Sequence, residues 1–259
     1  MTFDQANDLL VSAWDASGFA YVPVDRVSLV YRQTQLAGWY SMDMYDSDLD
    51  IIGEVVHPIH PDEIASADTP ALKLVHILAE RPKSGIIVFI LEEDAIVGTV
   101  SPEMFWGPVF RLCLFALTLE LESAALATAM RQPLVSWNAL SVGRRAKAEE
   151  IRERLRSAEH RNRLATRERA SLGPLLATTS FADKGTIVAK TKLLEGWTRD
   201  GVKSLFGRAE RVRNSCAHTR DTVDAPLGRD AKGVADFVDL CTRAIAGLRT
   251  TQRNGTEAG

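Results

Sequence analysis

The hydrophobic pattern of the sequence changes at Gly107, and this change restricts the fold more than any other feature of the chain. Before Gly107, short segments rich in Val, Ile and aromatic residues are typical of strands, and the clearest pair lies in IIVFILEEDAIVGTVS at 86–101. From Pro108 to about residue 250, apolar residues recur at helical spacing instead. The sequence therefore predicts an α+β protein: an α/β domain at 1–107, an all-helical domain at 108–250 and a flexible tail at 251–259.

The N-terminal domain is predicted to combine strands with short helices. Residues 5–17 predict a helix, FAYVPV and RVSLVYRQ within 19–33 predict two strands, and EVVHPI at 54–59 predicts a third. The segment ADTPALKLVHILAERP predicts a helix that Asp68 or Thr69 caps. Together with the hairpin that follows, these segments make a compact strand–helix–strand–strand unit.

The C-terminal domain is predicted to be a bundle of four or five helices. Gly173 and Pro174 are expected to break the chain between two helices, and Asp183 is expected to cap the helix after them. Helical periodicity predicts a helix from Pro108 to about Met130, a charged helix at 144–169 and a helix that contains IVAKTKLLEGW. Two more helices are predicted at 202–217 and 231–248.

Charge is distributed unevenly between the two parts. Residues 1–107 carry 5 Lys or Arg against 17 Asp or Glu, whereas residues 108–259 carry 26 against 17. The basic part is a candidate for contact with a polyanion. The alternative is that arginine-rich helices are simply well solvated, and charge alone favours neither interpretation.

The cellular compartment is predicted from what the sequence lacks. Three scattered cysteines without CxxC spacing favour a reducing compartment and argue against a cysteine zinc site. The acidic start MTFDQANDLL does not resemble a signal peptide. The most apolar run, VFRLCLFALTLEL, is interrupted by Arg111 and Glu120, so a membrane span is not expected. These features predict a cytoplasmic protein.

Two segments have the composition of metal sites but not the spacing. The loop MDMYDSDLD has no glycine or closing glutamate at the positions that a calcium loop requires. The segment HPIHPDE has His57 and His60 with Asp62 and Glu63, but its prolines favour a strand-to-loop corner. Neither segment is expected to bind a metal, and no cofactor is predicted.

The stretch RVRNSCAH at 211–218 carries the side chains that could perform chemistry. Asn214 and His218 are four residues apart and share one helix face, whereas Arg213 points about 140° away from His218. Arg213 flanks an apolar stripe and needs a carboxylate partner there, for which Glu120 is the candidate. Cys216 lies on the apolar face, which favours a packing role. A structural Arg–Glu pair beside a histidine at a helix end remains an alternative interpretation.

The segment Arg213-Asn214-Ser215-Cys216-Ala217-His218 resembles the R-x4–6-H motif of the HEPN superfamily, in its R-N-x-x-A-H form. Its place late in a helix of an all-α domain also resembles that family, over about residues 108–250. The resemblance implies a metal-independent ribonuclease that acts as a homodimer, with Arg213, His218 and Asn214 as catalytic residues. Toxins of this family carry a tyrosine two places after the histidine, but this chain has Arg220 there, so control through that tyrosine is not expected.

Residues 51–106 resemble one CBS repeat, with DTPALKLVHILAE as its helix and IIVFILEEDAIVGTVS as its hairpin. In CBS domains that bind adenosine nucleotides, a hydroxyl and a carboxylate near the hairpin hold the ligand. Thr99 and Ser101 match the hydroxyl positions, but Met104 takes the place of the carboxylate and Glu103 is displaced by one residue. The resemblance implies a domain that either senses a small nucleotide or sets the dimer.

The residue types of the motif suit metal-free cleavage of RNA. An unperturbed imidazole titrates near pH 6.5 and can act as acid or base, and a guanidinium grips phosphate oxygens with two hydrogen bonds. The sequence therefore predicts an endoribonuclease of defence or stress responses, such as a toxin, with RNA as its partner. The alternatives are a non-catalytic RNA- or nucleotide-binding module and a purely structural dimer.

Overall fold

The structure is a computed structural model, and it describes residues 19–24, 27–32, 35–41, 59–80, 87–93, 95–160, 172–217, 227 and 231–254. The chain divides into two compact units, Met1–Met104 and Phe105–Gly259, each described by itself here. Several predicted features lie outside the described residues: the helix at 5–17, the acidic loop before residue 51, most of the strand at 54–59, the end of the charged helix, and His218 with Arg220.

The first unit contains an antiparallel sheet with the strand order β1-β2-β3. Its strands are β1 (Phe19–Val24), β2 (Val27–Arg32) and β3 (Gln35–Ser41). β1 and β2 occupy the two segments that are predicted as strands, whereas β3 is not predicted. The register shifts between Val30 and Tyr31 of β2, which pair with Gly38 and Leu36, so the extra residue of this bulge is Ala37 in β3.

A second sheet of the first unit has the order β4-β5-β6. The turn η3 (Pro61–Glu63) leads into β4 (Ile64–Ser66), which pairs in parallel with β5 (Val88–Glu92), and β5 forms an antiparallel hairpin with β6 (Ala95–Val100). The helix α2 (Ala71–Ala79) joins the parallel pair, and η4 (Pro102–Trp106) follows β6. The predicted helix and hairpin are therefore present. The helix cap is Pro70 rather than Asp68 or Thr69.

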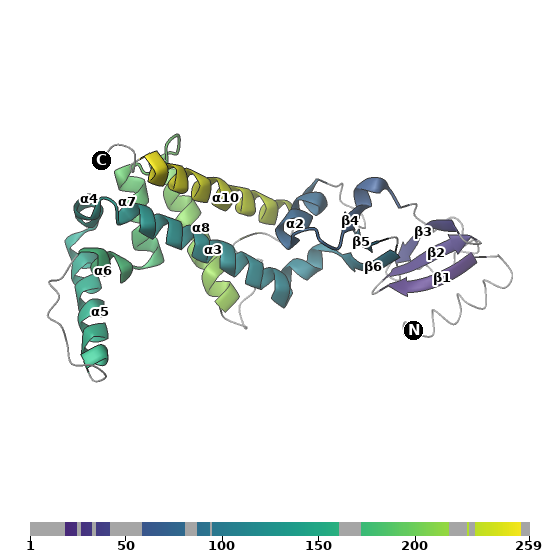
Figure 1. The fold of residues 1–259 in the computed structure, drawn as a ribbon, viewed down its shortest axis with the longest axis horizontal. Helices are drawn as coiled ribbons and strands as arrows, with labels where there is room; N and C mark the ends of the chain where they lie inside the picture. The colour runs from purple at the N-terminus through teal and green to yellow at the C-terminus, as the bar shows by residue number, and fades with distance from the viewer. Residues whose placement is uncertain are drawn as a thin grey trace. The chain divides into compact units, whose positions relative to one another are not determined.

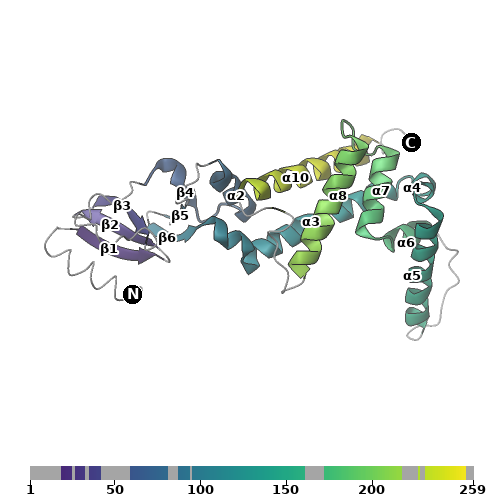
Figure 2. The ribbon, with the colours of Figure 1, turned by 180° about the vertical axis from the view of Figure 1, so that it is seen from behind.

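The described residues of the second unit after η4 form helices and no strand (Figures 1 and 2). Its described helices are α3 (Pro108–Ala129), α4 (Pro133–Ala139), α5 (Val142–His160), α6 (Leu172–Ala177), α7 (Phe181–Thr191), α8 (Arg199–Ala217) and α10 (Ala231–Asn254). α3 packs against α7, α8 and α10, and α7 packs against α8. The largest fully buried side chains of this unit are Phe105, Leu114, Leu121, Leu176, Phe181, Ile187, Phe206, Phe237 and Leu248. A mostly helical chain with small sheets is an α+β protein.

Several predicted helix boundaries are wrong. α10 continues to Asn254, into the segment predicted as a flexible tail. α7 begins at the N-cap Ser180, and Asp183 completes a capping box instead of capping the helix itself. The helix ends at Thr191, because Lys192 adopts the left-handed conformation at φ 54°, so most of LLEGW lies outside it. Gly173 and Pro174 do not break the chain but lie in the first turn of α6, where proline is tolerated.

Among the described residues, α3 is long and apolar enough to cross a membrane by length and composition, with a mean hydropathy of 1.5. Arg111 and Glu120, from which the sequence predicts no membrane span, do not take this helix outside those limits. Inside the unit, 44% of that apolar window is buried against protein. Core helices of soluble bundles can have the same length and composition, and α3 packs against α7, α8 and α10.

Gly185 permits the close contact between α7 and α8. A Cβ atom at this position would lie 2.5 Å from Cβ of Phe206. The Phe206 side chain is buried, and its ring centre lies 5.5 Å from the ring centre of Phe181. We therefore expect Gly185→Ala to destabilise the protein by about 1–3 kcal/mol through overpacking, measured by urea unfolding. Gly207→Ala is the matched control, because its Cβ would meet only Arg211 at 3.8 Å. Equal stability of the two variants would contradict this packing.

Candidate active site

Arg213 lies near the end of α8, at the rim of the buried seam between α3, α7 and α8. Its NH1 atom is 3.2 Å from Oε2 of Glu122, and its guanidinium lies 5.2 Å from the ring centre of Phe181. The side chain is 27% exposed. Arg213 therefore lies where the sequence predicts it, at the edge of the apolar stripe of α8. Part of its guanidinium faces solvent.

The prediction that Glu120 pairs with Arg213 is wrong. Glu120 pairs with Arg249 of α10, with 2.7 Å between Oε1 and NH2. Two residues along a helix correspond to a rotation of about 200°, so Glu120 and Glu122 lie on nearly opposite faces of α3. Glu122 faces α7 and α8, whereas Glu120 faces α10.

Glu122 holds two cations, not one. Nζ of Lys184 lies 2.9 Å from Oε1 of Glu122 and also donates to the carbonyl oxygen of Thr179 at 2.6 Å. The Lys184 side chain is only 5% exposed, and a buried ammonium requires such partners. The cluster of Glu122, Lys184 and Arg213 carries one net positive charge. Its carboxylate fixes the position of Arg213 while leaving the site cationic.

Asn214 lies directly beside this cluster. NH2 of Arg213 donates to Oδ1 of Asn214 at 3.3 Å, and the Asn214 side chain is exposed. The structure thus brings Arg213 and Asn214 together, although they diverge from the helix axis. α8 is described as far as Ala217, and His218 lies outside the described residues.

Arg111 also contacts the end of α8 near Arg213, and the sequence analysis did not identify this contact. Its NH2 donates to the carbonyl oxygen of Ser215 at 2.5 Å. The last carbonyls of a helix have no partner within the helix and carry partial negative charge, so a cation stabilises them. This bond connects the first turn of α3 to the last turn of α8. In the sequence, Arg111 is visible only as a charge that interrupts an apolar run.

Cys216 is half-buried, and its burial raises the pKa of the thiol above the ordinary value, although the nearby Arg111 lowers it in part. A thiol with a raised pKa is protonated at neutral pH and is a poor nucleophile. The pKa therefore agrees with the packing role predicted for Cys216. In α10, burial raises the pKa of Cys241 to about 12.

The remaining candidate residues lie in the first unit. Thr99 belongs to β6 and pairs with Phe89 of β5, Ser101 follows the strand, and Glu103 lies in η4. Glu63 accepts a hydrogen bond from the backbone nitrogen of His60 at 3.0 Å, which closes the turn η3. Within the described part of the chain, no three His, Cys, Asp or Glu side chains gather as metal ligands.

Comparisons of the chain with protein-family models, with curated proteins and with solved structures found no match. The function is therefore inferred from the chain's own residues and their geometry. The most specific arrangement in the helical unit is the guanidinium of Arg213, held from one side by Glu122 and Phe181 and bonded to Asn214.

Proposed function

We propose that this protein is a metal-independent endoribonuclease that acts as a homodimer, with an HEPN-like active site made of Arg213, Asn214 and His218. The observation that carries the proposal is the fixed, partly exposed guanidinium of Arg213, which lies five residues before His218 in the sequence. An arginine that a carboxylate and an aromatic ring hold from behind is preorganised to bind a phosphate in front.

The reaction would proceed through the 2′-hydroxyl of the RNA. The 2′-oxygen attacks phosphorus and loses its proton to a base, the P–O5′ bond breaks, and the 5′-oxygen takes a proton from an acid. One His218 can serve as the base and the His218 of a second copy as the acid. Arg213 would bind the phosphate oxygens on which negative charge builds up. Asn214 would position its neighbours.

Dimerisation is part of the proposal because the sequence spacing of Arg213 and His218 would direct their side chains about 140° apart on a helix. An exposed apolar stripe on α3 supports it: Val109, Leu112 and Leu119 are 68%, 67% and 43% exposed and lie on one side of the helix. Arg111, which bonds to the end of α8, neighbours this stripe. A two-fold axis at the stripe would bring two copies of the motif close together.

We expect Leu112→Glu to convert the dimer to a monomer and to abolish RNA cleavage, because it places two charges in an apolar interface. Light scattering at micromolar concentration measures the mass. Leu134→Glu is the matched control, because Leu134 has a similar exposure of 62% but lies on α4. A parent protein that is monomeric would count against the nuclease itself. A dimer that survives Leu112→Glu but not Leu134→Glu would place the interface on α4.

A non-catalytic RNA- or nucleotide-binding module is the second candidate function. The observation that favours it is the complete set of partners around Arg213, since an ion pair and a ring contact are also what a structural arginine makes. Gel cleavage of a mixed RNA pool in EDTA separates the two functions. Cutting supports the nuclease, whereas retention of intact RNA supports the binding module.

For the first unit, we propose a CBS-like domain that sets the dimer or binds a small nucleotide. The parallel pair of β4 and β5 joined by α2, followed by the β5–β6 hairpin, supports this comparison. Thr99 and Ser101 remain the candidate ligand residues, and Met104 still occupies the place where a ribose-binding carboxylate is expected. The dimer role is therefore favoured over tight nucleotide binding.

A further inference from the structure

A second cationic site lies on the helical unit, apart from the Arg213 cluster. Residues of α5, α7 and α8, together with Ser141 just before α5, line a cavity of about 380 Å³, and no Asp or Glu is among them. Its polar lining residues are Ser141, Arg144, Thr186, Lys190, Arg199 and Lys203. Four cations around one hollow repel one another, and an anion inside it would relieve that repulsion.

Internal contacts neutralise only part of this charge. NH1 of Arg144 lies 2.6 Å from Oδ1 of Asp183, and Nζ of Lys190 donates to the carbonyl oxygen of Ala139 at 2.7 Å. Arg199 and Lys203 are exposed, one turn apart on α8, and form no ion pair with any residue in the described part of the chain. The cavity therefore retains the charges of Lys190, Arg199 and Lys203 without a carboxylate.

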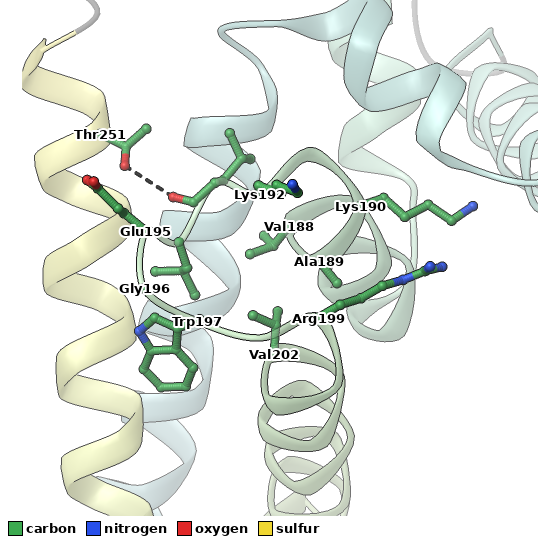
Figure 3. A pocket seen from close by; sticks show the side chains of 12 residues that line it. Val188, Ala189, Lys190, Lys192, Glu195, Gly196, Trp197, Arg199, Val202 and Thr251 are labelled. Carbon is green, nitrogen blue, oxygen red and sulfur yellow. Dashed lines mark hydrogen bonds between the residues drawn. The ribbon is translucent and has the colours of Figure 1, made fainter.

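A larger cavity of about 690 Å³ adjoins the first one and shares Lys190 and Arg199 with it. Figure 3 shows that these two side chains extend in the same direction, away from the side of the cavity where Trp197 lies. Lys192, Glu195 and the half-buried Trp197 also line this cavity, so it contains one carboxylate. We call the two joined cavities the basic groove. Trp197 lies on the other side of the larger cavity from Lys190 and Arg199, and the guanidinium of Arg243 is 5.9 Å from the centre of its ring.

The basic groove is distinct from the candidate active site but lies along the same helix. Arg199 and Arg213 are fourteen residues apart on α8, which corresponds to about 21 Å at 1.5 Å per residue. Arg199, Lys203 and Asn214 fall within about 60° of one another around that helix. An extended polyanion that follows this face would reach from one site to the other.

We propose that the basic groove binds the phosphate backbone of single-stranded RNA at a distance from the cleaved bond. Several cations and an aromatic ring that line one groove are the chemistry that holds single strands without regard to sequence. A single strand can enter a hollow, whereas the phosphates of a duplex lie on the outside of a rigid cylinder. The identity of the polyanion rests on the proposed function, but the groove itself does not depend on cleavage.

The test measures RNA binding in the 259-residue chain carrying His218→Ala, so that RNA is not cut. A labelled single-stranded RNA of about 12 nucleotides is titrated at several KCl concentrations. For single strands, the logarithm of the binding constant falls by about 0.7 per phosphate contact for each tenfold rise in salt. Adding Arg199→Gln and Lys203→Gln is therefore expected to reduce this slope by about 1.4 and to weaken binding about 25-fold at 0.1 M KCl.

The matched control replaces Lys73 and Lys232, two exposed lysines of α2 and α10, by glutamine. The control loses the same total charge, and its salt dependence is expected to equal that of the parent. Equal slopes for both double variants would overturn the groove. Equally tight binding of duplex RNA, or binding of inorganic phosphate or AMP without binding of RNA, would overturn the single-stranded ligand. A parent that binds with the expected slopes but never cuts RNA overturns the nuclease and leaves the groove standing.

Discussion

Replacing Glu122 by alanine is expected to destabilise the protein by about 3–5 kcal/mol, because it leaves a buried cation without its carboxylate. The cation in question is Lys184, whose side chain is 5% exposed and whose ammonium lies 2.9 Å from Glu122. The carbonyl oxygen of Thr179 would remain as a partner, but a neutral oxygen does not compensate a buried charge. Arg213 would lose its anchor at the same time, so cleavage should also fall.

Glu120→Ala is a close control for this experiment. Both residues are glutamates of α3, but Glu120 and its partner Arg249 are 45% and 59% exposed. Exposed ion pairs contribute at most about 1 kcal/mol, so Glu120→Ala should change the free energy of unfolding by no more than that. Urea unfolding measures both variants. Equal losses would show that the cluster of Glu122, Lys184 and Arg213 contributes no more than a surface pair.

A second variant separates the charge from the packing. Adding Lys184→Met to Glu122→Ala removes the buried cation as well, and an apolar side chain can fill the same space. We therefore expect the double variant to regain much of the lost stability without regaining cleavage, since Arg213 stays unanchored. A double variant as unstable as Glu122→Ala would assign the loss to something other than an unpaired Lys184.

The long helices could be predicted from the sequence because many residues contribute to their periodicity. Pro108 marks the start of α3, and the apolar positions of α8 and α10 repeat over several turns. Short elements were missed for the opposite reason: α4 spans only 7 residues. The end of α7 was misplaced because Lys192 adopts the left-handed conformation, for which lysine carries no sequence signal.

The surroundings of Arg213 were predictable only in part. The apolar stripe of α8 places Arg213 at a buried rim, but the choice between Glu120 and Glu122 depends on how α3 is rotated against its neighbours. Lys184 belongs to a third helix and has no local pattern that marks it as a partner. The same holds for the basic groove, because its cations come from three helices that only tertiary packing brings together.

Arg213→Ala should affect stability less than its ion pair alone suggests. Lys184 would still neutralise Glu122, so no bare carboxylate would remain, and the loss should be smaller than that of Glu122→Ala. Cleavage is nevertheless expected to fall strongly, although by less than in His218→Ala, because the guanidinium that binds the phosphate is gone.

The largest effect on activity is expected from His218→Ala, which should slow RNA cleavage by about 10²–10⁴-fold, the usual contribution of a general acid or base. Both roles would be lost at once in a homodimer, which places the expectation at the upper end of that range. Gel cleavage of a mixed RNA pool in EDTA measures the rate. Asn214→Ala should slow cleavage less than either His218→Ala or Arg213→Ala, since Asn214 only positions its neighbours.

The control for His218→Ala is His60→Ala, the same substitution at an exposed histidine of the first unit. Both variants should keep the stability of the parent within about 0.5 kcal/mol, and both should still bind RNA, because the basic groove is unchanged. Only His218→Ala should lose cleavage, so the loss can be assigned to chemistry rather than to folding or binding. If His218→Ala cuts RNA as fast as His60→Ala, the motif is a structural helix end, and the pairing of Arg213 with Glu122 serves the packing of α3 against α8.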